Sequence, residues 1–121
     1  MNRIFLFLLF TLVLIGFGSC TEENKSSSGS VNTKVYKSDE SIACESEGIS
    51  LGEMAQELTN FNITVFCSQK GNDGLVRTAV CGISTGDLNI YTIAADDIST
   101  ANGLGFRSTN ELSEYVDQPC D

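Results

Sequence analysis

The stretch Leu88-Asn89-Ile90-Tyr91-Thr92-Ile93 has the clearest secondary-structure pattern in the chain. Successive side chains of a β-strand point to opposite faces. One face would therefore carry Leu88, Ile90 and Thr92, and the other Asn89, Tyr91 and Ile93. We predict a strand over these six residues, because both sets contain large apolar side chains that a folded domain can bury.

A helix is predicted before this strand, from Leu51 to about Asn60. Ser50-Leu51-Gly52-Glu53 matches a capping box, in which the serine side chain accepts a hydrogen bond from the backbone N–H of the glutamate. Apolar residues then follow at helical spacing and form one stripe; they are Leu51, Met54, Ala55 and Leu58.

Three further strands and two further helical segments are predicted. The strands are a first one from about Val35 to Cys44, a second at 63–67 and a third at 75–81, with turns at 71–74 and 82–87. Asp96 and Asp97 favour a helix N-terminus, because an aspartate can cap the first turn and its negative charge interacts favourably with the helix dipole. Ile98, Ala101 and Leu104 would line that helix, with Gly105 as its stop. Residues 108–111 suit the start of a last turn that brings Leu112, Tyr115 and Val116 inward.

These elements predict an α+β domain. The expected architecture is a small antiparallel or mixed sheet of three to four strands, with two short helices on one face and disulfides as staples. A strand–helix–strand start could place one parallel pair in the sheet.

The first twenty residues have the layout of a secretory signal. A short start with Arg3 is followed by twelve residues from Ile4 to Ile15, of which only Thr11 is polar, and then by small residues before Cys20. This order is typical of a signal peptide, and the apolar run is shorter than the ~20 residues that span a bilayer.

The segment Phe17-Gly18-Ser19-Cys20 resembles the lipobox of bacterial lipoprotein precursors, with Phe17 where leucine is usual. The resemblance covers the first twenty residues and implies cleavage before Cys20 and lipid on its thiol. It predicts a signal peptide at 1–19, a lipidated N-terminus and flexible tether at 20–33, and the small α+β domain at 34–121. The alternatives are plain secretion, with Cys20 as a chance cysteine, and an uncleaved anchor.

The residues after Cys20 suggest a location. Thr21-Glu22-Glu23 resembles the export signal of Bacteroidetes-type surface lipoproteins, and position 21 is not the aspartate that retains lipoproteins in the inner membrane of enteric-type cells. Both resemblances imply a lipid-anchored protein of the bacterial cell envelope at the outer membrane, on its periplasmic face or the cell surface. Alternatively, the two glutamates belong to a soluble tether, as the flexible-linker composition of 26–30 suggests.

The chain is acidic, with 7 Lys+Arg, 16 Asp+Glu and a net charge of −9. Removal of Arg3 with a signal peptide would make the net charge −10. An acidic surface repels phosphate backbones and anionic lipid, so we expect no nucleic-acid partner and a membrane contact made by the N-terminal lipid alone.

Four cysteines remain besides Cys20, an even number that predicts two disulfides in a small exported domain. Three pairings are possible, and a bond to Cys120 would hold a chain end that otherwise frays. The chain has no histidine and no C-x-x-C pair, so a zinc site or a thioredoxin-like motif has little support. The disulfide candidates are Cys44, Cys67, Cys81 and Cys120.

Three features of the sequence resemble catalytic or metal-binding patterns. Gly82-Ile83-Ser84-Thr85-Gly86 has the letters of a hydrolase nucleophile motif, but that motif needs a strand-to-helix turn and a base. Here it joins two predicted strands, and only a lysine (Lys25, Lys34, Lys37 or Lys70) could replace the missing histidine. We interpret it as a hairpin turn.

We interpret the acidic pairs as helix caps and as surface charge that keeps the protein soluble, and not as the paired carboxylates of a glycosidase. Asn72-Asp73-Gly74 is a fragment of a calcium loop without its spacing. We therefore predict no catalytic residue, no metal and no cofactor. The acidic pairs are Asp96/Asp97, Asp39/Glu40 and Glu45/Glu47.

The expected function is that of a non-enzymatic envelope module that binds a protein partner or has a structural role. Addition of a partner strand to an exposed sheet edge is one physical mode of binding. The alternative is a small envelope enzyme or enzyme inhibitor that uses Ser84, a free thiol or the carboxylates.

Overall fold

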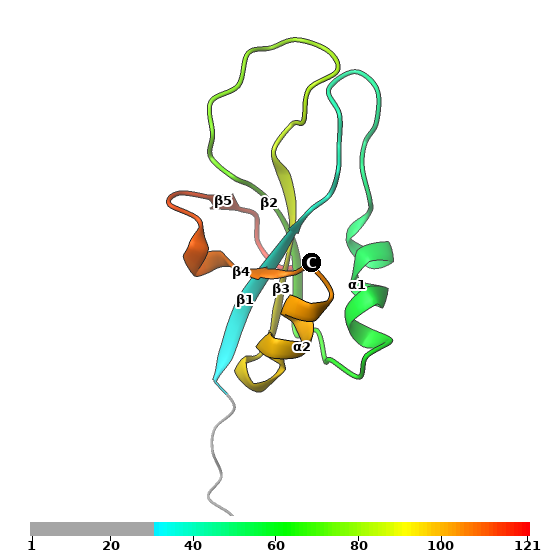
Figure 1. The fold of residues 1–121 in the computed structure, drawn as a ribbon, viewed down its shortest axis with the longest axis vertical. Coiled ribbons are helices and arrows are strands. Elements are labelled where there is room, and N and C mark those ends of the chain that lie inside the picture. The colour runs from blue at the N-terminus through cyan, green and yellow to red at the C-terminus, as the bar shows by residue number, and fades with distance from the viewer. Residues whose placement is uncertain (1–30) are drawn as a thin grey trace, which may run out of the picture.

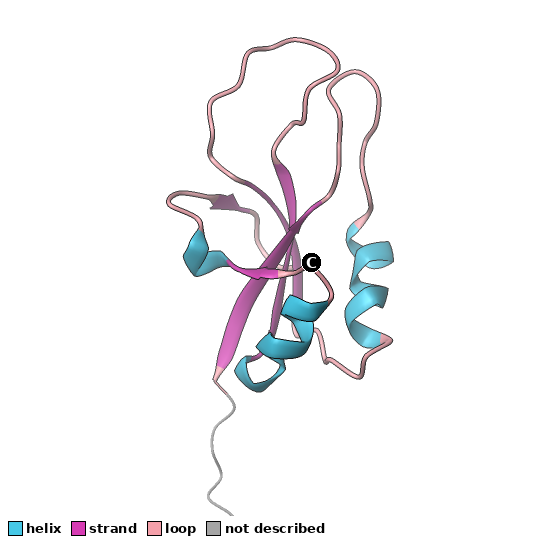
Figure 2. Ribbon diagram, in the orientation of Figure 1, coloured by secondary structure: helices cyan, strands magenta, loops and turns pink. Residues whose placement is uncertain are grey.

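The computed structural model describes residues 31–121, which form an α+β domain with a five-stranded sheet (Figures 1 and 2). The predicted signal peptide, Cys20 and most of the predicted tether lie outside the described residues. The strands and helices in chain order are β1 Asn32–Ser38, α1 Leu51–Thr59, β2 Cys67–Asn72, β3 Asp87–Ala94, the 3₁₀ turn η1 Ala95–Asp97, α2 Ile98–Gly103, β4 Arg107–Ser108, the 3₁₀ turn η2 Thr109–Glu111 and β5 Val116–Asp117.

The sheet has the strand order β4-β1-β3-β2-β5, and each neighbouring pair is antiparallel. The predicted α+β class is thus confirmed, but the sheet has five strands rather than three or four. β1 and β2 run parallel to each other, as a strand–helix–strand unit allows. They are not neighbours, because β3 lies between them, so the sheet is antiparallel and not mixed.

β3 is the central strand, and the predicted alternation of its side chains is confirmed. Leu88 and Ile90 are buried on one face of the sheet, whereas Asn89, Tyr91 and Ile93 are buried on the other. The strand pairs over seven residues with β1 and over six residues with β2. β3 is therefore covered by other parts of the domain on both faces of the sheet.

The helix α1 begins where the capping box predicts, since the Ser50 side chain accepts a hydrogen bond from the Glu53 N–H at 3.2 Å. Its stripe packs on the face of the sheet that carries Tyr91, and the Tyr91 hydroxyl donates to the Leu51 carbonyl at 2.7 Å. Each large side chain buried there contributes about 1.5–3 kcal/mol. The buried cluster joins both helices to the sheet and consists of Val35, Met54, Leu58, Ile63, Tyr91, Ile93, Ala101 and Phe106.

The helix α2 ends close to Gly105, whose φ of +91° confirms the predicted stop. Asp97 immediately precedes the helix, but its side chain makes no capping hydrogen bond. Ser108 does cap the last turn, by accepting from the Asn110 N–H at 3.3 Å. The predicted inward direction of Val116 is wrong, since that side chain is mostly exposed.

The C-terminal segment supplies both edges of the sheet. β4 pairs with β1, β5 pairs with β2, and the Gln118 N–H continues along the same edge to the Lys70 carbonyl at 2.9 Å. The Lys34 ammonium donates to Asp117 at 2.5 Å, which ties β1 to β5. Parts of both edges are therefore already paired, which leaves less room than we expected for a partner strand.

Three predicted strands differ from those observed. The first strand ends at Ser38, because Glu40 and Cys44 have positive φ values of 63° and 67° and turn the chain into a loop. Residues 63–66 form a connection whose Ile63 fills the core beneath α1, and the strand starts only at Cys67. Residues 75–81 form a loop.

Two disulfides are present, Cys44–Cys81 and Cys67–Cys120, so the prediction of two disulfides among these four cysteines is confirmed. The first joins two loops at one end of the molecule. The second holds the C-terminal tail against β2.

Candidate functional site

Two long loops project from the same end of the sheet, opposite the end at which β1 begins (Figure 1). We call residues 39–49 and 73–86 the distal loops. The first loop is fixed at its base by a hydrogen bond from Asp39 N–H to the carbonyl of Asp87, the first residue of β3, at 3.1 Å. The second loop is closed at its own base by a hydrogen bond from Asp73 N–H to the Gly86 carbonyl at 3.0 Å. The loops therefore leave the sheet side by side.

The distal loops are also joined to each other. Ala43 N–H donates to the Ile83 carbonyl and Gly82 N–H donates to the Ala43 carbonyl, both at 2.9 Å. The Cys44–Cys81 disulfide lies beside these bonds and closes the junction covalently. Backbone bonds and a covalent link together make the two loops one preorganised unit, although neither is a regular strand.

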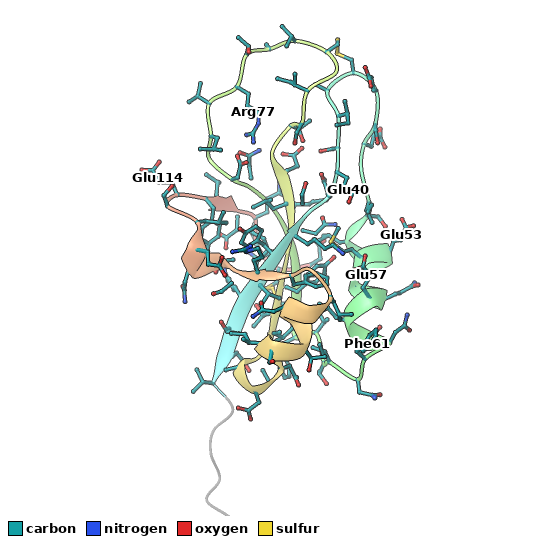
Figure 3. All side chains as sticks on the ribbon, in the orientation of Figure 1. Glu40, Glu53, Glu57, Phe61, Arg77 and Glu114 are labelled. Atoms are coloured by element: carbon teal, nitrogen blue, oxygen red, sulfur yellow. A yellow bond between two sulfur atoms is a disulfide. The ribbon has the colours of Figure 1, made fainter. Side chains whose placement is uncertain are left out.

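The second distal loop contains its own clamp. Arg77 donates from Nη1 to Asp73 Oδ1 at 2.7 Å and from Nη2 to Asp73 Oδ2 at 2.6 Å. This bidentate geometry is the strongest form of arginine–carboxylate pairing. It lowers the pKa of Asp73, and the Leu75 N–H adds a further bond to the same carboxylate. In Figure 3 the Arg77 side chain lies inside the curve of the loop and not at its outer surface.

Gly86 makes room for this clamp. Its φ is +81°, and a Cβ at this position would overlap the Arg77 guanidinium. Glycine is therefore needed here both for the backbone conformation and for the close approach of the arginine.

The clamp leaves apolar side chains on the outside of the loop. Leu75 is 63% exposed, Val76 is fully exposed and Val80 is 52% exposed. Beside them lies a shallow pocket of about 290 Å³. Its lining is mainly apolar and includes Ala43, the Cys44–Cys81 disulfide, Ala79, Val80 and Ile83.

The first distal loop, to which the second is joined, carries exposed acidic side chains. Glu40, Glu45 and Glu47 of the first distal loop are exposed. Within the two loops Arg77 is the one basic residue, and Asp73 already neutralises it. The distal loop surface, formed by both loops, therefore combines exposed apolar side chains on the second loop with exposed carboxylates on the first.

Ser84 lies in the wall of the pocket, and its contacts are those of a turn residue. Its hydroxyl accepts a hydrogen bond from the Gly86 N–H at 3.3 Å, and Gly82 and Gly86 both have positive φ. The three lysines of the described residues each pair with a carboxylate, namely Lys34 with Asp117, Lys37 with Glu57 and Lys70 with Asp39.

The structure does not bring the acidic pairs together in one place. Asp39 is buried and paired with Lys70, and its neighbour Glu40 is exposed. Asp96 and Asp97 belong to η1, at the opposite end of the sheet from the distal loops. Among residues 31–121, no three histidine, cysteine, aspartate or glutamate side chains are grouped so as to hold a metal ion.

Comparison of the chain with protein-family models, with curated proteins and with solved structures gives no match. In the part of the chain that the structure describes, no helix has the length and apolar character needed to cross a membrane.

Sequence patterns did not identify the distal loop surface. The segment that contains Leu75, Val76 and Val80 is rich in residues that favour strands, so the sequence predicted a strand of the sheet there. Two features of the sequence are consistent with a loop at this position. Asp73 and Arg77 are oppositely charged residues four positions apart, and glycine-containing turns lie on both sides of the segment.

Proposed function

We propose that the chain is a lipid-anchored protein of the bacterial cell envelope whose distal loop surface binds a protein partner. The observation that carries the proposal is the exposure of Leu75, Val76 and Val80 on loops held by the Cys44–Cys81 disulfide and the Asp73–Arg77 clamp. Apolar side chains that are held in an ordered, exposed position are typical of interaction sites.

The physical advantage lies in the low cost of ordering. Association loses binding free energy when loops must be fixed, and a preorganised loop avoids most of that loss. Burial of each of the three apolar side chains contributes up to about 1.5–3 kcal/mol. Together they can provide the centre of a small interface, with the pocket beside Val80 accepting a side chain of the partner.

The charges favour one kind of partner. Glu40, Glu45 and Glu47 are exposed on the first distal loop, and Arg77, the one basic residue of the two loops, is already neutralised by Asp73. The complementary surface is an apolar side chain flanked by lysine or arginine. Such complementarity speeds association and selects among partners.

The anchor places this surface away from the membrane. In our proposal Cys20 carries the lipid, and the ten residues between Cys20 and Val31, as a flexible coil, reach about 20 Å. The domain is then attached at the end where β1 begins, opposite the distal loops (Figure 1). Two or three acyl chains bury enough CH₂ groups, at about 0.8 kcal/mol each, for stable attachment.

Site-specific photo-cross-linking in the native cells tests the binding surface. A photoreactive residue at Val76 or Val80 should give an adduct of one defined mass, and the same residue at the exposed Ser99 of α2 should not. The charge-reversing variants Glu45→Lys and Glu47→Lys should weaken the adduct if the partner is basic. Adducts that form equally at Ser99, or that survive charge reversal unchanged, would contradict the proposal.

Fractionation of cells that express Cys20→Ser tests the anchor separately. We expect this variant to leave the membrane fraction. Its retention in that fraction, with the signal still removed, would show that lipid on Cys20 is not the anchor.

A further inference from the structure

A second group of exposed apolar side chains lies at the end of the domain opposite the distal loops. Val31 is 73% exposed, Phe61 58% and Phe66 54%. Exposed phenylalanines are costly to leave in water, because each carries a large apolar area. We call these three residues the proximal apolar group.

The sheet register shows why they share one end. β1 and β2 begin there and β3 ends there. Val31 accepts a hydrogen bond from the Ala95 N–H and Phe66 donates to the Thr92 carbonyl, both at 2.8 Å. Phe61 follows the C-terminal end of α1 and is labelled at the lower right of the molecule in Figure 3, on the side away from the distal loops.

The connection from α1 to β2 fixes the direction of the two phenylalanines. Phe61 N–H donates to the Leu58 carbonyl at 3.0 Å, and Ile63 N–H donates to the same carbonyl at 3.2 Å. Ile63 is buried and Val65 packs against the core. With those two positions directed inward, Phe61 and Phe66 remain outside although the backbone beneath them is well held.

We propose that the proximal apolar group lies in the interfacial region of the bilayer that holds the lipidated Cys20. The inference rests on the lipid anchor of the proposed function. Only ten residues separate Cys20 from Val31, so the anchor keeps this end of the domain within about 20 Å of the membrane. Aromatic rings are favoured at the membrane–water interface.

Attachment through the tether increases the fraction of molecules in which this weak membrane contact is formed. Partial burial of two phenylalanine rings and one valine provides a few kcal/mol at most, which is too little for a free protein to bind membranes firmly. A short flexible linker raises the effective concentration of the contact to the millimolar range, so that even this small free energy orients the domain. This changes the sequence-based expectation that the lipid alone touches the membrane.

The charges at this end of the domain favour a zwitterionic over an anionic lipid surface. Asp96 and Asp97 of η1 lie next to Ala95, and residues 60–66 and 95–98 contain no lysine or arginine. Anionic headgroups would therefore repel this face. The inferred contact is with a zwitterionic lipid surface, made by apolar side chains and not by charge attraction.

Tryptophan fluorescence provides a direct test, because the chain contains no tryptophan. Lipidated full-length protein carrying Phe61→Trp or Phe66→Trp is reconstituted into phosphatidylcholine vesicles with brominated acyl chains, which quench tryptophan in contact with them. Val76→Trp on the distal loops is the matched control. We expect quenching and a blue shift for the first two variants and neither for the control. Replacement of part of the phosphatidylcholine by phosphatidylglycerol should reduce the quenching.

The other outcomes overturn the inference in distinguishable ways. If the vesicle-bound protein shows no quenching at Phe61→Trp and Phe66→Trp, the inference fails and the lipid anchor stands. Equal quenching at Val76→Trp would show that the domain has no fixed orientation, and stronger quenching with phosphatidylglycerol would contradict the charge argument. Protein that does not float with the vesicles would overturn the anchor and this inference together.

Discussion

Asp39 and Lys70 form an ion pair at the junction of the distal loops and the sheet, with 2.8 Å between Lys70 Nζ and Asp39 Oδ2. Asp39 also accepts from the Ser41 N–H at 2.9 Å, and its carbonyl accepts from the Ile49 N–H at 2.6 Å. Lys70 reaches the Ile49 carbonyl at 3.5 Å. One buried carboxylate and one lysine of β2 thus hold both ends of the first distal loop.

The substitution Asp39→Asn should lower the free energy of unfolding at neutral pH by about 2 kcal/mol, the usual contribution of a charged hydrogen bond. Burial raises the pKa of Asp39, but the hydrogen bonds from Lys70 and Ser41 outweigh burial, so the pKa lies below its usual value of 3.8. The stabilisation is therefore complete above about pH 4 and is lost as the pH falls through the lowered pKa.

Urea denaturation at about pH 7 and about pH 3 measures this difference. The difference in stability between the variant and the wild type should be smaller at the lower pH than at the higher one. Asp96→Asn is the control, since Asp96 is exposed at the other end of the domain. An equal loss of stability at both pH values would show that the ionised form of Asp39 is not the source of the effect.

Removal of the Cys44–Cys81 disulfide should loosen the distal loops and leave the rest of the sheet folded. The two cysteines are 37 positions apart, so the chain-entropy model gives a loss of about 3–4 kcal/mol for Cys44→Ala/Cys81→Ala. Hydrogen exchange should become faster at the amides of Ala43 and Gly82, which bridge the two loops, and stay slow in β3. Unchanged protection at these two amides would show that the backbone bonds alone order the loops.

The elements that sequence patterns predicted correctly are those whose signals are local. Ser50 and the apolar stripe after it lie within one helix, and the alternation at 88–93 lies within one strand. β2 has the sequence CSQKGN, which carries little strand signal. It is a strand because β3 and β5 pair with it from distant parts of the chain.

The distal loops show the opposite case. Residues 75–81 favour a strand by composition, yet the Cys44–Cys81 disulfide and the Asp73–Arg77 clamp hold them in a loop. Both contacts join residues whose proximity depends on the fold. For the same reason the cysteine count predicted two disulfides and left three pairings open, and composition gave no sign that Leu75 and Val76 are exposed.

Two glycines should respond to alanine in opposite directions. A Cβ on Gly71 in β2 would lie 2.8 Å from the Val116 carbonyl and closer still to the Ile90 side chain. Gly71→Ala should therefore destabilise the domain by about 1–3 kcal/mol through overpacking. Gly52 in α1 has no atom within 4 Å of the corresponding position, so Gly52→Ala should stabilise it by about 0.5–1 kcal/mol.

Thermal unfolding of both glycine variants, followed by circular dichroism, checks the pair. The melting temperature should fall for Gly71→Ala and rise for Gly52→Ala. A stable Gly71→Ala variant would mean that β5 can move away from β2 at little cost.

The last prediction concerns the C-terminal tail, which Cys67–Cys120 holds against the outer edge of β2. Without this bond, the tail depends on the β2–β5 pairs, the Lys34–Asp117 ion pair and two backbone hydrogen bonds to β2, from Gln118 to Lys70 and from Asp121 to Ser68. We expect Cys67→Ala/Cys120→Ala to fray the tail and to expose unpaired groups of β2. An exposed strand edge pairs with other chains. Sedimentation should therefore show more self-association than in the wild type, and the Gln118 amide should exchange faster. Cys44→Ala/Cys81→Ala is the control, because it removes the other disulfide and leaves this edge covered. A variant that sediments like the wild type, with a protected Gln118 amide, would mean that the ion pair and the backbone bonds hold the tail on their own.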